Sequence, residues 1–487
     1  MATSASIPED AKIDSRVEHL EDLNPDPKDN HTHVDGNALL VNKDGEVRRI
    51  PVPSSDPNDP LNFRKWEKYG LVFCCCWFSS MGLSIASGLG AILSVFFQMY
   101  TPQGYSSDEI VLLITIPTLC IGLGNYIILP LSLAYGRRPV FLGFMIILLI
   151  ATIAAALQNS YNGHLASRIV QGLATGASES LLPLMLTEVT FLHERSRIFG
   201  LYWMAQNAIS STINLASSYI NHDLGWRWYY WVFVITVAVG LVIAFFFAFE
   251  TQFTRPPESL DGQLVITDEF GVTRVIPDSE AQAYLEEMSR SGLTAPGAGN
   301  AAGAIERKTY VQRIRPWSTP HPQPLQVMLL SWKHMAESMS SPGIIYAVLT
   351  SSIALGCGVG MSLTYNTVLM DNYHWQAADI GLINVGGVIG AVLAIIIIST
   401  TFASEAAPKH PGPALVVVVG TKNVVSFGVT YGLTPMVERF GYQTAFGVLA
   451  GIFGVIFLLG IPVYIINPKW RAYMSERESR QGRVGAP

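Results

Sequence analysis

The sequence is poor in charged residues and in cysteine, and each shortage excludes a class of protein. Asp, Glu, Lys and Arg make up only 14% of the 487 residues, against about 25% in a soluble domain. An ordinary soluble protein is therefore excluded. The five cysteines do not form a disulfide framework, since three of them, Cys74 to Cys76, are consecutive within an apolar segment. We expect these thiols to pack as small apolar groups.

Several functional motifs are also absent. The sequence has no Gly-x-x-x-x-Gly-Lys-Ser/Thr loop to hold a nucleotide phosphate, no His-Glu-x-x-His helix, no Gly-x-Ser-x-Gly elbow and no cluster of metal ligands. We therefore expect no enzyme activity, no ATP site, no cofactor and no bound metal. No apolar stretch lies near Met1, so we also expect no cleavable signal peptide and a first membrane segment that directs its own insertion.

Long apolar segments are what the sequence does contain. A helix needs about 20 apolar residues to cross a hydrocarbon core of ~30 Å, and most of the segments reach that length. The ten segments are Leu71–Phe97, Ile110–Leu133, Val140–Leu157, Leu165–Phe191, Ile198–Ile220, Trp228–Phe249, Ile344–Met370, Ile380–Phe402, Pro413–Pro435 and Ala445–Ile466. They predict an all-α, polytopic membrane protein, a helical bundle with about ten transmembrane helices, six in the first half and four in the second.

The charges in the short loops predict the orientation of the bundle. Cytosolic loops of membrane proteins are enriched in Lys and Arg. The loops at 101–109 and 158–164 have neither residue. The basic residues lie before the first segment, after the second and after the fourth: Arg64, Lys65, Lys68, Arg137, Arg138, Arg195 and Arg197. We therefore expect both termini in the cytosol and, as the location, the plasma membrane.

The apolar segments divide the chain into five regions. We predict a disordered cytosolic tail at 1–66, a six-helix bundle at 67–250, a cytosolic central loop at 251–341, a bundle of about four helices at 342–467 and a cytosolic tail at 468–487. Trp317 and Trp332 in the central loop suit a segment on the membrane surface. We favour the simpler interpretation of a linker between the two bundles.

Three local motifs carry a resemblance to a known family. They are Pro130–Pro139 with Gly136-Arg137-Arg138 inside it, Arg168-Ile-Val-Gln171-Gly172, and His193-Glu194-Arg195. Together with six helices, a long loop and further helices, they resemble the major facilitator superfamily. The resemblance implies two bundles that expose a midplane site to each side of the membrane in turn. Two further segments, Gly225-Trp226-Arg227-Trp228 and Asp56–Arg64, resemble the corresponding segments of fungal members that export drugs or metabolites.

The resemblance also implies a latch in the loop between the second and third helices. We expect Gly136 to permit a tight turn and Arg137 or Arg138 to bind Glu188 at the cytosolic end of the fourth helix; Arg195 completes the latch. Leu133 stands where the family has an acidic residue, so the latch would depend on the arginines alone. The alternative is that the arginines only anchor a helix end.

The fourth segment has ionisable residues and glycines on one face. Arg168, Gly172, Gly176, Glu179 and Pro183 fall within about 80° on the helical wheel. Gly172 and Gly176 favour close approach of another helix. Because Arg and Glu are costly in lipid, we expect Arg168, Gln171 and Glu179 to face a polar cavity or partner. For Glu179, substrate or proton handling and a structural, hydrogen-bonded carboxylate both stay open.

Further candidates for the substrate path lie in the fifth helix and in the second half. The fifth helix lacks the Gly-Pro signature of the family's antiporters, which removes one support for proton exchange. It carries a polar stripe within about 120°, which would line an aqueous path or bond neighbouring helices. The candidates are Tyr202, Gln206, Ser210, Asn214 and Ser217 in the stripe and Tyr365, Asn366, Lys422 and Asn423 in the second half. For Lys422, snorkelling and pairing with a buried carboxylate also stay open.

The second half is shorter than the superfamily pattern. Ile380–Phe402 resembles helix eight and Pro411–Pro435 resembles helix eleven, with only Ser404–His410 between them. Helices nine and ten are therefore expected to be missing, either in a real ten-span protein or through a splice or gene-prediction artefact. We expect a secondary transporter, an exporter of small organic molecules, acting as a monomer in the lipid bilayer, with protons as one option for the coupling ion and no nucleic-acid partner. The alternative is a ligand-binding membrane sensor or a defective, truncated paralogue that does not transport.

Overall fold

The computed structural model describes residues 51–253 apart from 52 and 55, three strands between 258 and 277, and residues 307–376, 382–386 and most of 411–473. Nearly all of them belong to one compact unit, Gly36–Trp470. The predicted tail before residue 51, most of Ile380–Phe402 and the side chain of Asn366 lie outside the described residues. The same holds for Ser404–His410, where two helices were predicted to be missing.

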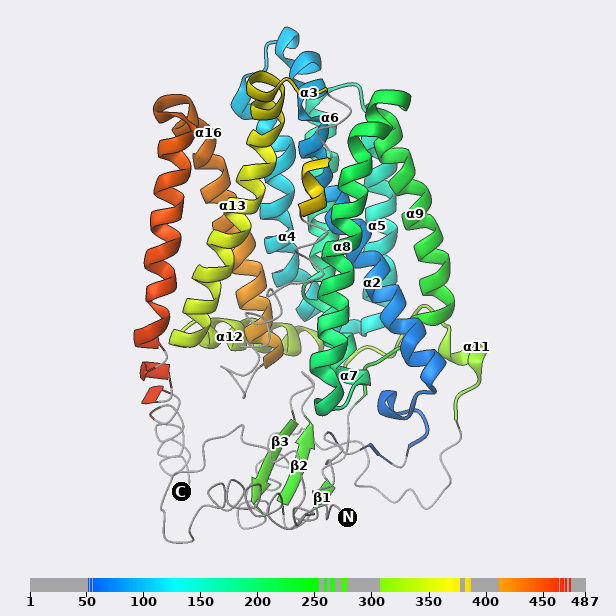
Figure 1. Cartoon of the computed structure of the whole chain (residues 1–487). Coiled ribbons are helices and arrows are strands. Elements are labelled where there is room, and N and C mark those ends of the chain that lie inside the picture. Colours follow the sequence, from blue (N-terminus) through cyan, green and yellow to red (C-terminus); the bar gives the residue numbers. More distant parts are fainter. Residues whose placement is uncertain are drawn as a thin grey trace, which may run out of the picture. The chain divides into compact units, whose positions relative to one another are not determined.

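All six apolar segments predicted in the first half are helical, as Figure 1 shows. Two of them are broken by short 3-10 turns, whereas the sequence predicted continuous helices. The elements are η1 (Pro60–Asn62), α2 (Lys65–Ser87), η2 (Gly88–Ile92), α3 (Leu93–Tyr100), η3 (Thr101–Gln103), α4 (Ser107–Tyr135), α5 (Arg137–Leu157), α6 (Tyr161–Thr175), η4 (Gly176–Ser178), α7 (Leu181–Val189), α8 (Leu192–Leu224) and α9 (Trp226–Phe247).

The ends of α4 follow from local chemistry. At its start, the Ser106 side chain accepts a hydrogen bond from the Glu109 amide, and the Glu109 carboxylate accepts one from the Ser106 amide at 2.8 Å. This reciprocal capping box supplies acceptors to amides that have no partner inside the helix. At its end, Gly136 has φ +102° and ψ 153°, a conformation that is open almost only to glycine. The chain can therefore turn directly into α5.

The second half contains α11 (Tyr310–Arg313), α12 (Pro324–Ser338), α13 (Pro342–Tyr373) and α16 (Pro411–Leu458). α16 is two arms joined at Gly441, where φ is 78°, and the arms run antiparallel in Figure 1. The predicted end of this span at Pro435 is wrong, because the first arm continues past that proline to the turn at Gly441.

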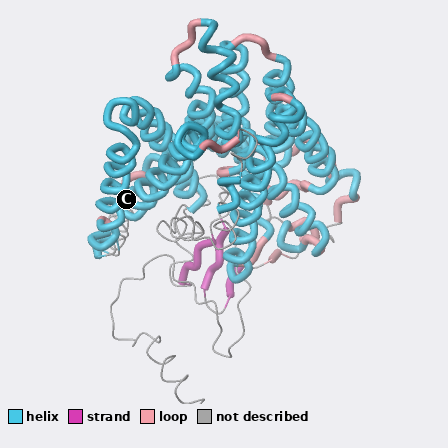
Figure 2. Tube along the Cα trace, turned by 45° about the horizontal axis from the view of Figure 1, so that its top comes forward, coloured by secondary structure: helices cyan, strands magenta, loops and turns pink. Residues whose placement is uncertain are grey.

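The central loop contains secondary structure that the sequence analysis did not predict. The strands β1 (Glu258–Leu260), β2 (Gln263–Thr267) and β3 (Thr273–Pro277) form an antiparallel sheet in the order β1-β2-β3. Val265 of β2 pairs with Val275 of β3. Figure 2 separates these strands from the helices by colour. The spans that the structure describes are helical.

Six helical segments among the described residues are long and apolar enough to cross a membrane. They are Lys65–Gln103, Ser107–Tyr135, Arg137–Leu157, Trp226–Phe247, Pro342–Tyr365 and Val416–Asn467, of which the last contains both arms of α16. The predicted fourth and fifth spans are not among them, because the fourth is interrupted at η4 and the fifth carries the polar stripe. The protein has the all-α, polytopic fold of an integral membrane protein.

Glycines allow α4 and α6 to pack with their backbones in contact. A Cβ added at Gly172 would lie 2.6 Å from the Pro117 carbonyl oxygen, and one at Gly176 would lie 2.9 Å from that of Ile121. Both contacts are with backbone, which cannot rotate away. The two glycines therefore form the close-approach face that their spacing of four predicts.

The two halves meet along a contact that we call the seam, formed by α4 and α7 on one side and α13 and α16 on the other. A buried cluster there joins Leu129 and Leu184 of the first half to Val348 and Val416 of the second. Elsewhere on the seam, the Tyr126 hydroxyl of α4 lies 2.6 Å from the Thr421 hydroxyl of α16. The seam is therefore apolar with single polar contacts, and the candidate site lies on it.

Gly172→Ala tests the α4–α6 contact. We expect it to destabilise the folded protein by about 1–3 kcal/mol, because overpacking forces backbone shifts. The measurement is the thermal unfolding midpoint of the purified protein in detergent. Gly143→Ala in α5 is the matched control, since a Cβ there has nothing within 4 Å and the change removes backbone entropy from the unfolded chain. Equal midpoints for the two variants would contradict the packing.

Candidate functional site

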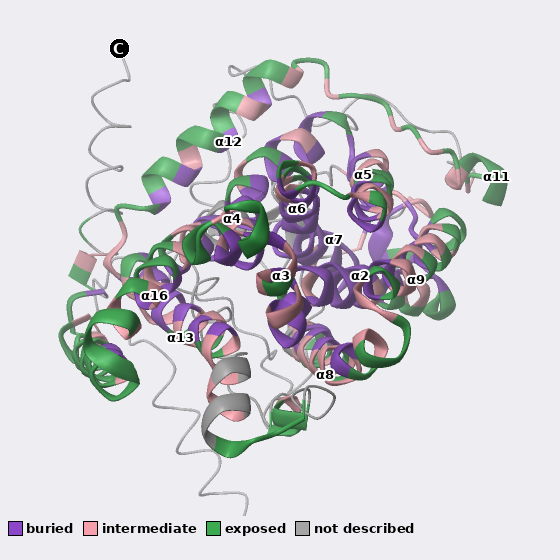
Figure 3. Cartoon of the chain, turned by 90° about the horizontal axis from the view of Figure 1, so that it is seen from above, coloured by how far each residue is buried: buried purple, intermediate pink, exposed green. Residues whose placement is uncertain are grey.

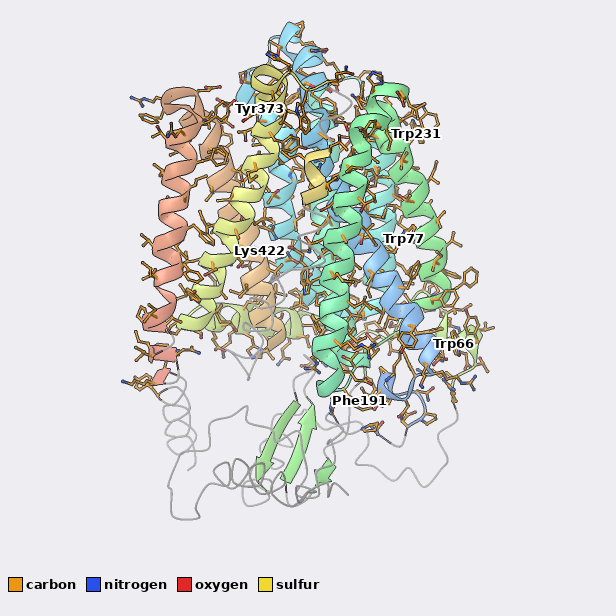
Figure 4. All side chains as sticks on the ribbon, viewed as in Figure 1. Trp66, Trp77, Phe191, Trp231, Tyr373 and Lys422 are labelled. Carbon is orange, nitrogen blue, oxygen red and sulfur yellow. The ribbon has the colours of Figure 1, made fainter. Side chains whose placement is uncertain are left out.

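Glu179 lies in the break of the fourth span, between η4 and α7, and its side chain is buried. Its Oε1 accepts a hydrogen bond from Lys422 Nζ at 2.9 Å, and its Oε2 accepts one from the Asn423 amide. Lys422 and Asn423 come from the first arm of α16, so the contact joins the two halves across the seam. Figure 4 shows Lys422 about midway along the spans. A carboxylate and an ammonium thus neutralise each other at the centre of the bundle.

One side chain of α8, Trp203, borders this ion pair. The Trp203 ring centroid lies 5.8 Å from Lys422 Nζ, within the range of a cation–π contact. The Trp203 indole nitrogen and both amide atoms of the buried Gln206 have no hydrogen-bond partner among the described residues. Buried polar groups normally have partners, so these three atoms are exceptions within the described part of the chain. Sequence analysis missed Trp203, because a tryptophan in an apolar helix carries no signal of its own.

Arg168 is buried in the first half and binds backbone carbonyls there. Its Nη1 donates to the Ile85 carbonyl at 2.6 Å and its Nη2 to that of Ala86 at 2.7 Å. Both carbonyls lie at the end of α2, where the break at η2 leaves acceptors without helical partners. Nη1 also donates to Gln171 Oε1 at 3.0 Å.

The fourth partner of Arg168 is created by a proline. Pro117 lies inside α4 and has no amide hydrogen, so the carbonyl four residues earlier, that of Leu113, loses its helical donor. Arg168 Nε donates to this oxygen at 2.8 Å. One guanidinium therefore satisfies the free carbonyls of two helices, which lipid cannot do.

The polar stripe of α8 faces α2, η2 and η4 within the first half. The Tyr202 hydroxyl donates to the Ser178 carbonyl, and Asn214 Nδ2 donates to Ser87 Oγ at 3.1 Å. Ser210 and Ser217 are buried. Of the remaining candidates, Tyr365 of α13 hydrogen-bonds the side chain of Asn384. The structure therefore brings Glu179, Lys422 and Asn423 together and places Arg168, Gln171 and most of the stripe in separate contacts.

The latch residues meet at the end of the bundle where the basic loops lie, which we call the basic end. Arg137 Nη2 lies 2.8 Å from Glu188 Oε1, and both side chains are buried. Glu188 Oε2 also accepts a hydrogen bond from the Thr251 hydroxyl. Arg195 Nη2 lies 3.4 Å from the Thr187 carbonyl oxygen. Arg137 and Glu188 thus hold α5 against the end of α7.

Arg138, also at the basic end, connects the start of α5 to the end of α9 and to the central loop. Its Nη2 donates to the carbonyls of Phe245 at 2.6 Å and Ile314 at 2.8 Å. Glu250, which sequence analysis missed, accepts hydrogen bonds from the backbone amides of Arg137 and Arg138 at 3.0 and 3.3 Å. An anionic side chain at a helix N-terminus is favourable for its free amides and dipole. The signal that could have identified Glu250 is an acidic residue just after an apolar span.

Comparison with known proteins places this geometry in a family. The family model described as Major Facilitator Superfamily matches residues 72–486, which is most of the chain. The chain belongs to the Major Facilitator Superfamily.

Two relatives of this chain are fungal. An uncharacterized MFS-type transporter of Schizosaccharomyces pombe is 27% identical over 288 residues, which cover 56% of this chain and 49% of the relative. The efflux pump radE of Floropilus chiversii is 25% identical over 222 residues, which cover 44% of this chain and 40% of that protein. The matches thus span about half of each relative or less.

A solved structure has a similar fold. The crystal structure of a POT family transporter in complex with 5-aminolevulinic acid matches with a TM-score of 0.50 at 13% identity, over 82% of this chain and 96% of that one. At this identity the likeness shows the fold alone.

Arg168→Met tests the role of the buried guanidinium. The methionine leaves carbonyls of α2 and α4 without donors, at about 1–3 kcal/mol for each unsatisfied group, so we expect a large loss of thermal stability in detergent. Arg227→Met is the control, because Arg227 is exposed and its Nη2 donates to the Asn159 side chain. If the Arg168 variant is as stable as the Arg227 variant, the hydrogen bonds from Arg168 to the backbone carbonyls do not stabilise the protein.

Proposed function

We propose that the protein is a secondary transporter of small organic molecules that works by alternating access, with its site around Glu179, Lys422 and Asn423. The superfamily is one of membrane transporters, which supports transport as the general activity. The observation that carries the proposal is the ion pair between Glu179 and Lys422, because its partners come from opposite sides of the seam. Movement of one half against the other must change this contact.

In this proposal, the ion pair couples proton binding at Glu179 to the movement of the two halves. Separating Lys422 from an ionised Glu179 leaves charges in an apolar interior, and insertion scales put that cost at about 2.5–3.5 kcal/mol for each centrally placed charge. A proton on Glu179 removes the carboxylate charge and weakens its hold on Lys422. The seam therefore opens more readily when Glu179 is protonated, and the proton is the coupling ion that we propose.

The substrate binds beside the ion pair in this scheme. Trp203 Nε1 and Gln206 Nε2 are donor atoms and Gln206 Oε1 is an acceptor atom, and none of the three has a partner among the described residues. The surrounding side chains are largely apolar. Such a mixture suits partly apolar molecules with a few hydrogen-bonding groups.

Direction and location belong to the proposal as well. We propose export, and the printed name of the relative radE, an efflux pump, supports this direction. Arg137, Arg138 and Arg195 mark the basic end, which faces the cytosol by the positive-inside rule. We therefore propose that both termini lie in the cytosol, that the plasma membrane holds the protein and that it acts as a monomer.

Glu179→Gln tests the site in an efflux assay with a fluorescent dye in cells that express the chain. Breaking a buried ion pair costs about 3–5 kcal/mol, and ~1.4 kcal/mol corresponds to tenfold, so we expect efflux to fall by about tenfold or more. Glu337→Gln is the matched control, since Glu337 lies 3.7 Å from Lys333 in an exposed ion pair. Cells without the chain give the baseline; if cells with the chain do not exceed it, the protein does not transport the dye.

A charge reversal separates coupling from folding. The double variant Glu179→Lys with Lys422→Glu restores an ion pair across the seam, so we expect membrane expression close to that of the wild type. Efflux should stay low, because the titrating carboxyl has moved from the break of the fourth span to α16. Recovery of efflux together with expression would show that the pair serves folding only.

A protonophore tests the driving force. If the proton gradient drives export, collapsing it should reduce dye efflux to the level of cells that lack the chain. ATP levels are measured in parallel, so that loss of cellular energy is not mistaken for loss of the gradient. Undiminished efflux in the presence of the protonophore would rule out the proton as the coupling ion.

A further inference from the structure

Lys422 reaches out of its own half to make the central ion pair. Seen from above, α13 and α16 lie on one side of α4, and α2, α8 and α9 lie on the other (Figure 3). Lys422 Nζ lies 2.9 Å from Glu179 Oε1, and the residue stands about midway along the spans in Figure 4. A flexible alkylammonium therefore lies beside a carboxylate at the centre of the bundle.

This ion pair uses only part of the hydrogen-bonding capacity of either group. Lys422 Nζ has three N–H donors, and Glu179 Oε1 is its one acceptor among the described residues. The Glu179 carboxylate has about four acceptor positions, and within the same part of the chain it receives hydrogen bonds from Lys422 and Asn423. Arg168, by contrast, donates to three backbone carbonyls and to the Gln171 side chain. Lys422 is thus held less completely than the cation that stabilises the first half.

Trp203 offers a second contact for a cation beside the same carboxylate. Its ring centroid lies 5.8 Å from Lys422 Nζ, close to the ~6 Å limit of a cation–π contact. The indole is buried, and its Nε1 has no hydrogen-bond partner among the described residues. The lysine stem limits how near its ammonium comes to the ring, whereas a free molecule has no such limit. A small amine can therefore approach both Glu179 and the indole face.

Replacing one ammonium by another keeps the charge of Glu179 balanced. A buried carboxylate is costly without a cationic partner, but any ammonium can be that partner. Lys422 is the more accessible member of the pair, since its side chain is 15% exposed and that of Glu179 is 5% exposed. Once displaced, the Lys422 ammonium needs water, which enters between the halves when they separate.

Given the proposed transport function, on which this inference rests, we propose that Lys422 holds the place of the substrate's own ammonium. The substrate class is then a protonated amine that carries an aromatic or other apolar group. Its ammonium takes the position of Lys422 Nζ at Glu179 Oε1 and lies over the Trp203 ring. The displaced lysine turns into the water between the halves. Substrate binding thus removes the contact that holds the seam closed.

Calorimetric titration of the purified protein in detergent with phenethylammonium tests this exchange. Phenethyl alcohol is the neutral ligand of nearly the same shape. Lys422→Met keeps an apolar stem but removes the competing ammonium. A site that is mostly occupied by its own lysine loses apparent affinity in proportion, so we expect the variant to bind phenethylammonium about tenfold more tightly than the wild type. The alcohol should show no such gain.

Lys333→Met is the matched control variant, because Lys333 lies 3.7 Å from Glu337 in an exposed ion pair. It should bind both ligands as the wild type does. If Lys422→Met binds phenethylammonium no more tightly than the wild type, or gains equally for the alcohol, the proposal is overturned. No detectable binding of phenethylammonium to any folded variant would overturn it as well.

Trp203→Leu gives a second test that leaves the ion pair in place, in case Lys422→Met does not fold. We expect binding of phenethylammonium to weaken severalfold more than binding of the alcohol, because the ring face attracts the cation. Equal losses for the two ligands would contradict the proposed position of the ammonium.

The dye-efflux assay distinguishes failure of this inference from failure of the proposed function. If cells with the chain export the dye while phenethylammonium does not bind, the amine proposal fails and transport stands. If efflux does not exceed that of cells without the chain, the proposed function fails, whatever the titrations show.

Discussion

The arrangement of the first half depends on backbone carbonyls that the bilayer cannot hydrogen-bond. The break after α2 and the proline Pro117 in α4 both leave carbonyl oxygens without helical donors, and Arg168 donates to three of them. In water such a residue would be replaceable, but in a membrane interior each free polar group is costly. Arg168 thus allows the first span to break beside the polar stripe of α8. The glycine contact between α4 and α6 brings the arginine close enough to do so.

At the seam, by contrast, the ion pair between Glu179 and Lys422 joins the two halves of the protein instead of stabilising one of them. Glu179 lies where the fourth span is interrupted, so its side chain can reach α16 instead of a neighbour within its own half. Lys422 and Asn423 complete its hydrogen bonds. An ion pair of this kind is stable only while the halves stay in contact, so it suits the changing contact of the proposed transport cycle. Arg137 and Glu188, by contrast, form a buried ion pair within the first half, at its basic end.

Part of this could be predicted from sequence because the signals are local. The spacing of Gly172 and Gly176 predicts a close helix contact, and the apolar segments predict the spans. The partner of Glu179 could not be predicted, since Lys422 lies 243 residues away and no periodicity relates the two. The breaks at η2 and η4 were missed because apolar composition alone does not distinguish a continuous helix from an interrupted one.

The central claim is that the halves rock about the seam, with Glu179 controlling the motion. Pulsed electron paramagnetic resonance measures it directly, with one label pair at the basic end, Tyr135 and Ile345, and one at the opposite end, Leu224 and Tyr373; all four side chains are exposed. The account predicts that replacing Glu179 by glutamine shifts the two distance distributions in opposite directions. Distributions that stay unchanged, or that shift in the same direction at both ends, would contradict it.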